Sequence, residues 1–295
     1  MHLGIITVRD GTFHPNRRLI ESSGDKGHRV TLIHPYRLWP VIADNALQTA
    51  APIRYEPLDV ILPRQGAEIG TSSRVLINQL QLMDIPLVND LDAIRLTSNQ
   101  FLTLQALANA GVPVPDTLFI NASIGLNEMP DYLTDFPVVL KQINGRQGSG
   151  VALARSRTEL EHLVNASLDE TQGLLLQQYI APTDRQDIRV FLIGGKIAGA
   201  MRLTPPQGEF RANYHLGARS RPHDLADATA RVAVAATAAV GLDIAGVDLI
   251  IDAKNRVYVI EVNYSPGFRG LEAATGLDIA GLIIDYTTGI AGRNR

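Results

Sequence analysis

Short apolar runs alternate with helical patterns along the first ninety residues of the chain. Apolar runs of strand length are predicted at residues 3–8, 30–34, 59–62 and 86–88. Helical spacing of apolar positions separates them at residues 17–26 and 73–83. Strands that alternate with helices in this way are typical of a small α/β unit with a mostly parallel sheet.

A further helix is predicted over residues 97–110, where Phe101 and Leu104 begin a helical repeat of apolar positions. Ser98 is placed to cap the start of this helix, and Gly111, which is followed closely by two prolines, ends it. We place a domain boundary just before this helix.

Beyond Pro137 the pattern changes to β-rich runs, which indicates an α+β region with largely antiparallel strands. The predicted strands cover residues 138–141, 151–154, 174–178, 188–193, 196–202, 245–252 and 256–263, and the helices cover 158–164, 225–240 and 278–289. Gly194-Gly195 predicts a tight hairpin turn, because both central positions of such turns favour positive φ. We therefore divide the chain into residues 1–92, 93–178 and 179–295.

Composition and charge narrow the classes of function. The 27 basic and 30 acidic side chains give a net charge of −3, so no overall positive field favours non-specific nucleic-acid binding. The absence of cysteine excludes disulfides, thiolate metal sites and thiol nucleophiles. No apolar stretch reaches the ~18 residues that span a bilayer, and the first residues do not resemble a secretion signal. We expect a cytoplasmic protein that binds neither nucleic acid nor membrane.

The most informative chemistry lies in two β-rich segments that flank Lys254-Asn255. If those two residues form a hairpin turn, residues whose numbers sum to 509 face each other, and Asp248 lies opposite Glu261. Because side chains alternate along a strand, Asn263 shares the face of Glu261. Three oxygen-bearing side chains are therefore predicted to converge.

Two explanations account for such an acidic pair. Like charges directly opposite on a sheet are destabilising by up to about 1 kcal/mol, and by more where they are flanked by apolar residues. Either one carboxylate is protonated or paired with a nearby arginine, or the oxygens hold a divalent cation such as Mg²⁺. On the second explanation, removing either acid relieves repulsion and leaves folding intact.

A glycine-rich segment, Gly145-Arg146-Gln147-Gly148-Ser149-Gly150, joins the strand that ends at Lys141 to the next strand. No helix follows it, and its glycine order is the reverse of a dinucleotide-binding fingerprint, which disfavours a Rossmann oxidoreductase. The segment is either an ordinary turn or a loop whose amides cover polyphosphate, with Lys141 reaching the phosphate oxygens.

Three other stretches carry weaker signals. Residues 174–180 form either a plain buried strand or a strand whose backbone hydrogen-bonds an adenine edge. Asp187 and Arg189 share one strand face, and Arg211 lies two residues from Asn213. Arginines such as Arg189 and Arg211 are most often simply exposed to solvent. The alternative is that these cations lie near a bound phosphate.

Together these motifs resemble the ATP-grasp superfamily and, within it, the RimK-type α-L-glutamate ligases. The resemblance covers nearly the whole chain. It rests on residues 138–141 with 145–150, then 177–180, 187–189, 208–215, 245–248, 261–272 and 275–280, and also on Arg9-Asp10-Gly11 and on residues 62–66.

The resemblance implies the ATP-grasp fold, with an N-terminal α/β domain followed by two α+β lobes that clasp ATP. It implies ATP with Mg²⁺ or Mn²⁺ as cofactors and a reaction in which ATP converts a carboxylate to an acyl phosphate that an amine then attacks. The expected substrates are an amino acid, glutamate above all, and a carboxylate-bearing acceptor such as a small acid or the C-terminus of a peptide or protein. Relatives are often homo-oligomers, and we expect the same here.

The resemblance also assigns roles to individual residues. For the nucleotide they are Lys141 on the phosphates, Gln178, Tyr179 and Ile180 along the adenine, and Gly148, Gly150 and Asp187 elsewhere in the nucleotide site. For the metal they are Asp248, Glu261 and Asn263. For the transferred phosphate or acyl phosphate they are Arg189, Arg211 and Asn213.

One departure from the family pattern stands out. Relatives commonly carry a lysine at the start of the helix after the domain boundary, where this chain has Gln100. A contact to phosphate is therefore expected to be missing. It leaves open an alternative function, that of a nucleotide-binding regulatory protein with reduced catalysis.

Overall fold

The computed structural model describes residues 1–51, 56–65, 69–122, 126, 133, 135–143, 150–181, 183, 185–212 and 217–293. The predicted α/β unit is present at the N-terminus. The strands β1 (His2–Ile6), β2 (Arg29–Ile33) and β5 (Val60–Pro63) form a parallel sheet in the order β2-β1-β5. The run at 86–88 contributes only a single parallel bridge, between Leu87 and Ile61. The helices α1 (His14–Asp25) and α2 (Thr71–Leu82) accompany this sheet.

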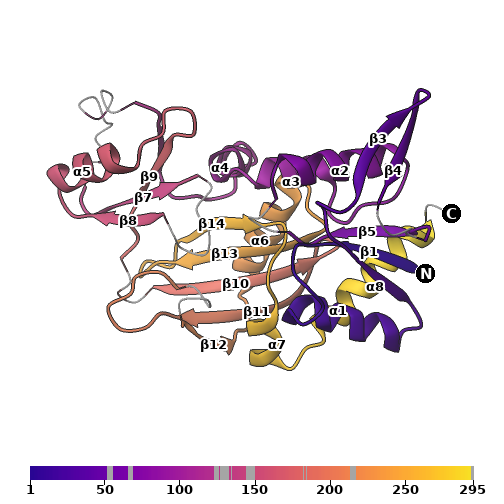
Figure 1. Ribbon diagram of the computed structural model, residues 1–295. Coiled ribbons are helices and arrows are strands. Elements are labelled where there is room, and N and C mark those ends of the chain that lie inside the picture. The colour runs from indigo at the N-terminus through magenta and orange to yellow at the C-terminus, as the bar shows by residue number, and fades with distance from the viewer. Residues whose placement is uncertain are drawn as a thin grey trace.

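The last helix, α8 (Ile279–Arg293), packs against α1 and β5 of the N-terminal sheet, so the two ends of the chain lie together (Figure 1). Leu3 and Leu19 share one buried core with Ile283. Ion pairs border the contact, Arg18 with Asp278 at 2.9 Å and Lys26 with Asp285 at 2.8 Å. The N-terminal sheet is therefore completed by the end of the sequence.

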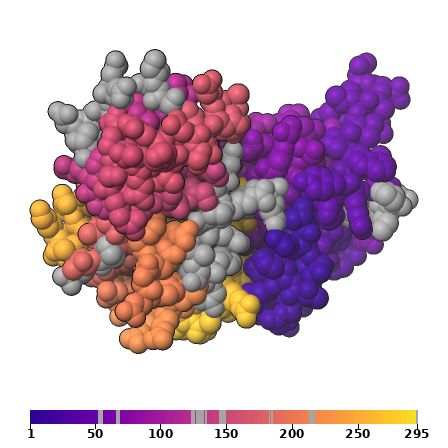
Figure 2. Space-filling model, turned by 60° about the vertical axis from the view of Figure 1, so that its left-hand side comes forward, coloured from indigo at the N-terminus to yellow at the C-terminus, as the bar shows by residue number. Residues whose placement is uncertain are grey.

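A β-hairpin that the sequence analysis did not predict projects from the N-terminal unit (Figures 1 and 2). It consists of β3 (Trp39–Ala43) and β4 (Ala46–Ala50). Asp44 and Asn45 connect the strands with φ of 50° and 58°. Positive φ at both central positions is the geometry of a two-residue hairpin turn, which Asp and Asn tolerate. This dipeptide is the signal that would have identified the hairpin.

The helix predicted over 97–110 is confirmed as α4 (Gln100–Asn109), and a separate helix that the sequence analysis did not predict, α3 (Leu91–Thr97), precedes it. Ser98 is the residue after α3 and does not cap α4. Instead the side chain of Asn99 accepts hydrogen bonds from the backbone N–H groups of Phe101 and Leu102. The predicted cap was therefore wrong by one residue, and Asn serves as well as Ser in that role.

The central lobe is a four-stranded antiparallel sheet in the order β6-β9-β7-β8. Its strands are β6 (Thr117–Ile120), β7 (Val138–Gln142), β8 (Val151–Ala154) and β9 (Leu174–Gln178). The helix α5 (Arg157–Ser167) covers one face, and its Leu160 and Val164 are buried against Leu140 and Leu176. In the space-filling view this lobe lies above the C-terminal segments (Figure 2).

The C-terminal lobe is a five-stranded antiparallel sheet in the order β12-β11-β10-β13-β14. Its strands are β10 (Gln186–Ile193), β11 (Lys196–Thr204), β12 (Arg219–Pro222), β13 (Ile244–Ile251) and β14 (Val257–Asn263), and its helices are α6 (Asp227–Ala239) and α7 (Arg269–Thr275). The predicted turn at Gly194 and Gly195 is confirmed, with φ of 58° and 73°. Strand β14 lies nearest the central lobe (Figure 1).

In the described part of the chain, every helix is too short or too polar to cross a membrane. The division into residues 1–92, 93–178 and 179–295 stays a prediction.

Candidate active site

Asp248 and Glu261 face each other across β13 and β14, as the sequence predicts. The turn that joins the strands, however, is not the two-residue turn at Lys254-Asn255. The backbone N–H of Asp252 donates to the carbonyl of Arg256 at 3.0 Å, which leaves three residues in the loop, and Asn255 has a φ of 61°. Such a loop pairs residues whose numbers sum to 508.

A β-bulge corrects the register before the acidic residues are reached. Leu249 pairs with Val259, whereas Asp248 pairs with Glu261, so Ile260 is an extra residue on β14. Without the bulge, Asp248 would face Ile260 and Glu261 would point to the other side of the sheet. The predicted pairing is therefore confirmed, but it results from a longer loop and a bulge that offset each other.

A cation from the protein already accompanies Asp248. Arg189 on β10 is the register partner of Asp248 on the other side of β13. Its guanidinium donates from Nε to Oδ1 at 2.6 Å and from Nη2 to Oδ2 at 2.5 Å. The arginine explanation left open by the sequence thus holds for Asp248, and electrostatic repulsion alone does not require a metal here.

Glu261 differs from Asp248 because its side chain forms no ion pair with any residue that the structure describes. Loss of hydration raises the pKa of the Glu261 carboxyl, and Asp248 raises it further, against opposing effects of Arg189 and Lys141. Asn263 follows on the same strand face, and its Oδ1 accepts a hydrogen bond from the N–H of Ser265 at 3.0 Å.

Lys141 reaches the same electrostatic neighbourhood from β7 of the central lobe. Its Nζ donates to Oε1 of Gln177 at 2.7 Å, and Gln177, which is only 2% exposed, donates to Thr117 Oγ1 at 2.9 Å. Burial lowers the pKa of Lys141 to about 8, while Glu261 and Asp248 act to raise it. The sequence analysis missed Gln177 in this role, although it alternates faces with the predicted Gln178.

The residues that link the two lobes are tied down by an arginine that the sequence analysis did not single out. Arg185 is buried and donates to the carbonyl of Ile180 at 2.5 Å, to the carbonyl of Phe210 and to the Asp187 carboxylate at 3.0 Å. Burial raises the pKa of Asp187 despite this partner. Asp187 thus has a structural partner of its own.

The residues predicted along the adenine lie at this link. The backbone N–H of Gln178 donates to the carbonyl of Asp116 at 2.9 Å, so it continues the sheet. The ring of Tyr179 meets that of Phe210 edge to face, with 6.2 Å between centroids. Ile180 is buried.

Arg211 is paired with a carboxylate that is its near neighbour in sequence. It donates to both carboxylate oxygens of Glu209, at 2.8 and 2.6 Å, and this hydrogen bonding lowers the pKa of Glu209 to about 2. The other two predictions in these loops, Gly148 and Asn213, lie outside the described residues.

Gly150 is the last residue of the glycine-rich segment, lies directly before β8 and has a φ of 75°. A Cβ at this position would come within 2.5 Å of Gln142 Oε1. Its carbonyl accepts a hydrogen bond from the N–H of Gln142 at 2.8 Å, which extends the β7–β8 pairing. A glycine is therefore required here by the backbone.

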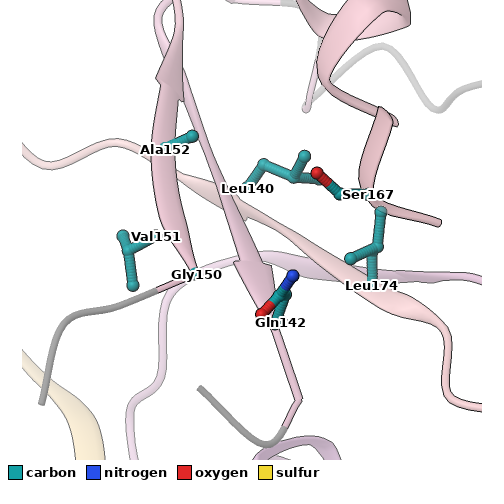
Figure 3. Close-up of a pocket in the computed structure, with 7 residues that line it drawn as sticks. All are labelled: Leu140, Gln142, Gly150, Val151, Ala152, Ser167 and Leu174. Atoms are coloured by element: carbon teal, nitrogen blue, oxygen red, sulfur yellow. The ribbon is translucent and has the colours of Figure 1, made fainter. Parts of the chain in front are cut away.

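A small hollow lies on the other side of the same sheet (Figure 3). It has a volume of about 110 Å³, and Leu140, Gln142 and Leu174 are among its lining residues. Because side chains alternate along β7, Lys141 points away from this hollow. The hollow is therefore separate from the acidic centre.

Gln100, at the start of α4, touches the bulge. Its Nε2 donates to the carbonyl of Ile260 at 3.4 Å. The position at which relatives commonly carry a lysine thus lies beside Glu261, and a neutral amide contacts the backbone there.

The oxygens of Asp248, Glu261 and Asn263 fit a divalent cation. They share one face of the sheet and are hard donors of the kind that Mg²⁺ prefers. Among the described residues there is no cluster of three or more His, Cys, Asp or Glu side chains that could hold a metal, and this set contains two carboxylates and one amide. Arg189 occupies one acceptor site on each Asp248 oxygen, so a metal would either share Asp248 with the guanidinium or displace it from one oxygen.

Comparisons with known proteins point in one direction. The chain matches the model of the RimK PreATP-grasp domain over residues 1–94 and that of the RimK-like ATP-grasp domain over residues 97–287. It is 35% identical over 289 residues to the probable alpha-L-glutamate ligase of Aliivibrio salmonicida, which covers 97% of this chain and 95% of that protein.

Solved structures share the fold at lower identity. A RimK domain ATP-grasp protein from Sphaerobacter thermophilus is 22% identical with a TM-score of 0.74, covering 97% of this chain and 99% of the other. The ATP-grasp ligase PsnB, complexed with a minimal precursor, Mg and ADP, is 16% identical with a TM-score of 0.73, covering 98% and 97%. These structures support the predicted three-part fold.

Proposed function

Because the chain belongs to the RimK-like ATP-grasp family, we propose that it is an ATP-dependent ligase that joins the amine of glutamate to a carboxylate of an acceptor. The observation that carries this proposal is the full-length similarity to probable alpha-L-glutamate ligases, together with the meeting of Lys141, Asp248 and Glu261 between two lobes. The acceptor is a small acid or the end of a peptide or protein.

The reaction transfers the γ-phosphoryl group of ATP to a carboxylate oxygen and releases ADP. The amine nitrogen then attacks the acyl carbon, phosphate leaves, and an amide bond and a proton remain. Such chemistry needs positioning and charge neutralisation more than a protein nucleophile. The acidic centre offers both, since cations from two strands approach it.

Lys141 binds phosphate oxygens in this proposal. Gln177 holds its Nζ with a neutral carbonyl oxygen, so the charge of Lys141 is not cancelled by a carboxylate in direct contact. Tyr179 and Ile180 line the adenine with the backbone of Gln178, and Gly150 closes the adjoining hairpin. Asp187 acts on the nucleotide site through Arg185.

Asp248, Glu261 and Asn263 would hold Mg²⁺, whose charge would offset the negative charge that develops on the transferred phosphoryl group. Arg189 would then share Asp248 with the metal. When Asp248 turns one oxygen away, the freed part of the Arg189 guanidinium can donate to the phosphoryl group or to the activated carboxylate. Arg211 would bind the same group once its guanidinium leaves Glu209 for a phosphate, and Asn213, two residues later in the sequence, is assigned to that group as well.

The proposal is tested by supplying ATP, Mg²⁺, isotopically labelled glutamate and a panel of acceptors that includes free dicarboxylic amino acids and peptides ending in Glu or Asp. We expect ADP formation that depends on an acceptor, and a product heavier by one or more glutamyl residues in mass spectrometry. Glu261→Gln serves as the inactive control.

Two outcomes would contradict the proposal. ATP binding without acceptor-dependent ADP formation across the panel would favour the regulatory protein that Gln100 leaves open. ADP formation without incorporated label would show that the amine is not glutamate.

A further inference from the structure

Arg64 follows the last residue of β5, at the edge where the parallel strands of the N-terminal sheet end. Its backbone N–H donates to the carbonyl of Ile6 at 2.8 Å, so it continues the strand. Open α/β sheets bind ligands at this carboxyl edge. The residue belongs to the segment 62–66, whose role the acidic centre does not explain.

The Arg64 guanidinium is buried without an acid. The residue is 9% exposed, and its Nη2 donates to the carbonyl of Pro266 at 2.7 Å. Its Nε is buried with no hydrogen-bond partner, and no carboxylate of a described residue pairs with it. Burial lowers the pKa of Arg64 to about 10 with no opposing carboxylate. By contrast, Arg185, the other arginine under 10% exposed among the described residues, contacts the Asp187 carboxylate.

A second unpaired polar group lies on the same aromatic ring. The guanidinium of Arg64 is 5.8 Å from the centroid of Phe268, and the His14 ring meets Phe268 edge to face at 5.9 Å. Nδ1 of His14 is also buried without a partner. The nearby acid, Glu272, faces the other nitrogen of His14 at 3.7 Å and is bound by Arg18 at 3.2 Å. The region around Phe268 therefore has unsatisfied hydrogen-bonding groups and an uncompensated positive charge.

This region is connected to the proposed metal ligands through Pro266. Pro266 lies three residues after Asn263, so the chain limits their separation to about 11 Å. A Cβ on Gly246, which pairs with Asn263, would come within 2.7 Å of Pro266. Pro266 thus packs beside the acidic centre while its carbonyl holds Arg64.

We propose that Arg64 is a specificity-determining residue that binds a substrate carboxylate other than the one that is activated. The inference rests on the proposed ligase function and deepens it, since it makes the substrate a dicarboxylate or a peptide that carries a second carboxylate. The bidentate geometry of a guanidinium suits a carboxylate. The carboxylate belongs either to glutamate or to the acceptor.

The test measures binding directly, so that it does not depend on turnover. The wild-type protein and Arg64→Gln, both saturated with ADP and Mg²⁺, are titrated calorimetrically with L-glutamate and with the dipeptide Ala-Glu. The same acids with one carboxylate converted to an amide are titrated in parallel. We expect Arg64→Gln to bind the acid roughly 10- to 100-fold more weakly, as for the loss of a charge-assisted contact, and to bind the matching amide as the wild type does.

The two arms identify the source of the carboxylate. A loss confined to L-glutamate assigns Arg64 to the incoming amino acid, and a loss confined to the dipeptide assigns it to the acceptor. Acid binding by Arg64→Gln within twofold of wild type, or no acid binding by the wild-type protein, would overturn the proposal. If Arg64-dependent acid binding occurs without any ADP formation, the carboxylate site is supported and the ligase function is contradicted. If Arg64→Gln ligates normally with an unchanged KM, the ligase function is supported and the carboxylate site is contradicted.

Controls separate recognition from folding. Arg29→Gln removes an exposed arginine of the same sheet, paired with Glu56 at 2.5 Å, and should leave acid binding unchanged. Because Arg64 has no acid partner, Arg64→Gln should unfold at a temperature no lower than wild type and keep its ADP affinity. If that variant fails to fold, Arg64→Lys keeps the charge without the fork, and we expect it to raise KM for the acid while kcat holds. An unchanged KM in Arg64→Lys would then count against the proposal.

Discussion

Lys141 and Arg189 supply positive charge to one site from two different lobes, and their partners differ. Lys141 is held by the neutral amide of Gln177, and burial lowers its pKa. Arg189 is held by both oxygens of Asp248, which raises its pKa although burial opposes this. The comparison teaches that a cation held by a neutral group can bind an anionic ligand directly. A cation that is paired with a carboxylate must first give up that partner.

On this basis the central lobe has a cation ready for an anion, whereas the C-terminal lobe has one that must first be exchanged. Nucleotide binding is then expected to depend chiefly on Lys141, and the chemical step on the release of Arg189. The following predictions test this difference.

The largest effect is expected from Asp248→Asn. Turnover should fall by roughly 10³-fold or more, because a metal ligand is lost. The free energy of unfolding should fall by about 2–4 kcal/mol, because Arg189 loses its counter-charge. The sequence alone predicted intact folding for this variant, and the pairing with Arg189 reverses that expectation. Urea denaturation measures the change.

A double variant sharpens this prediction. Asp248→Asn combined with Arg189→Met should recover much of the lost stability, since no unpaired charge remains. The Arg189→Met single variant completes the cycle, and a destabilisation of the double variant equal to the sum of the two single changes would show that the pair does not couple.

Glu261→Gln should lose turnover to a similar degree but keep its stability. The Glu261 carboxyl has no ion-pair partner among the described residues, and its pKa is raised, so the neutral amide relieves a cost. Thermal unfolding without Mg²⁺ measures this, and a clear drop in the unfolding temperature would contradict it. The contrast with Asp248→Asn separates the two members of the acidic pair.

Lys141→Met should weaken ATP binding by roughly 10- to 100-fold, the effect of one charge-assisted contact. The variant retains the length of the side chain, so packing beside Gln177 is little disturbed. Calorimetric titration with ATP and Mg²⁺ measures the affinity. An unchanged affinity would exclude Lys141 from the phosphates and would remove one side of the comparison.

The same residue predicts a pH effect on the ligand-free protein. The pKa of Lys141 is about 8 in the folded protein against 10.5 for an ordinary lysine. Between these values the unfolded chain binds more protons, so the stability of the wild type relative to Lys141→Met should rise by about 2–3 kcal/mol as the pH increases from 8 to 10.5. Parallel denaturation curves at several pH values measure this difference, and a flat difference would show that Lys141 keeps an ordinary pKa.

The smallest effect is expected from Gln100→Lys, which restores the residue common in relatives. A lysine beside the Ile260 carbonyl adds positive charge near the proposed phosphate site, and we expect ATP affinity to increase by a few-fold. Gln100→Met is the matched control, because it removes the amide without adding charge. Equal ATP affinities in Gln100→Lys and Gln100→Met would show that a positive charge at this position does not affect nucleotide binding.

Much of the fold follows from local patterns in the sequence. Alternating elements identified the parallel sheet, and Gly194-Gly195 located a hairpin correctly. The pairing of Asp248 with Glu261 was also predicted, yet the bulge at Ile260 that produces it depends on packing and carries no local signal. The Asp248–Glu261 pairing was therefore predicted correctly although the turn on which the prediction rested was wrong.

The contacts that decide the electrostatics were not predictable in the same way. Arg189 meets Asp248 because β10 lies beside β13, a neighbour relation between strands more than fifty residues apart. Arg185 and Gln177 likewise acquire their roles from tertiary placement. A sequence shows which side chains carry charge, whereas the order of strands in a sheet determines which charges cancel.

The docking of α8 on the N-terminal sheet has a consequence for biosynthesis. Leu3, Ile5 and Leu19 are synthesised more than 250 residues before Ile283 and Ile284, which share their buried core. The apolar face of the N-terminal sheet that packs against α8 therefore stays exposed while both lobes are translated. Chaperone dependence of the nascent chain should accordingly end when α8 emerges.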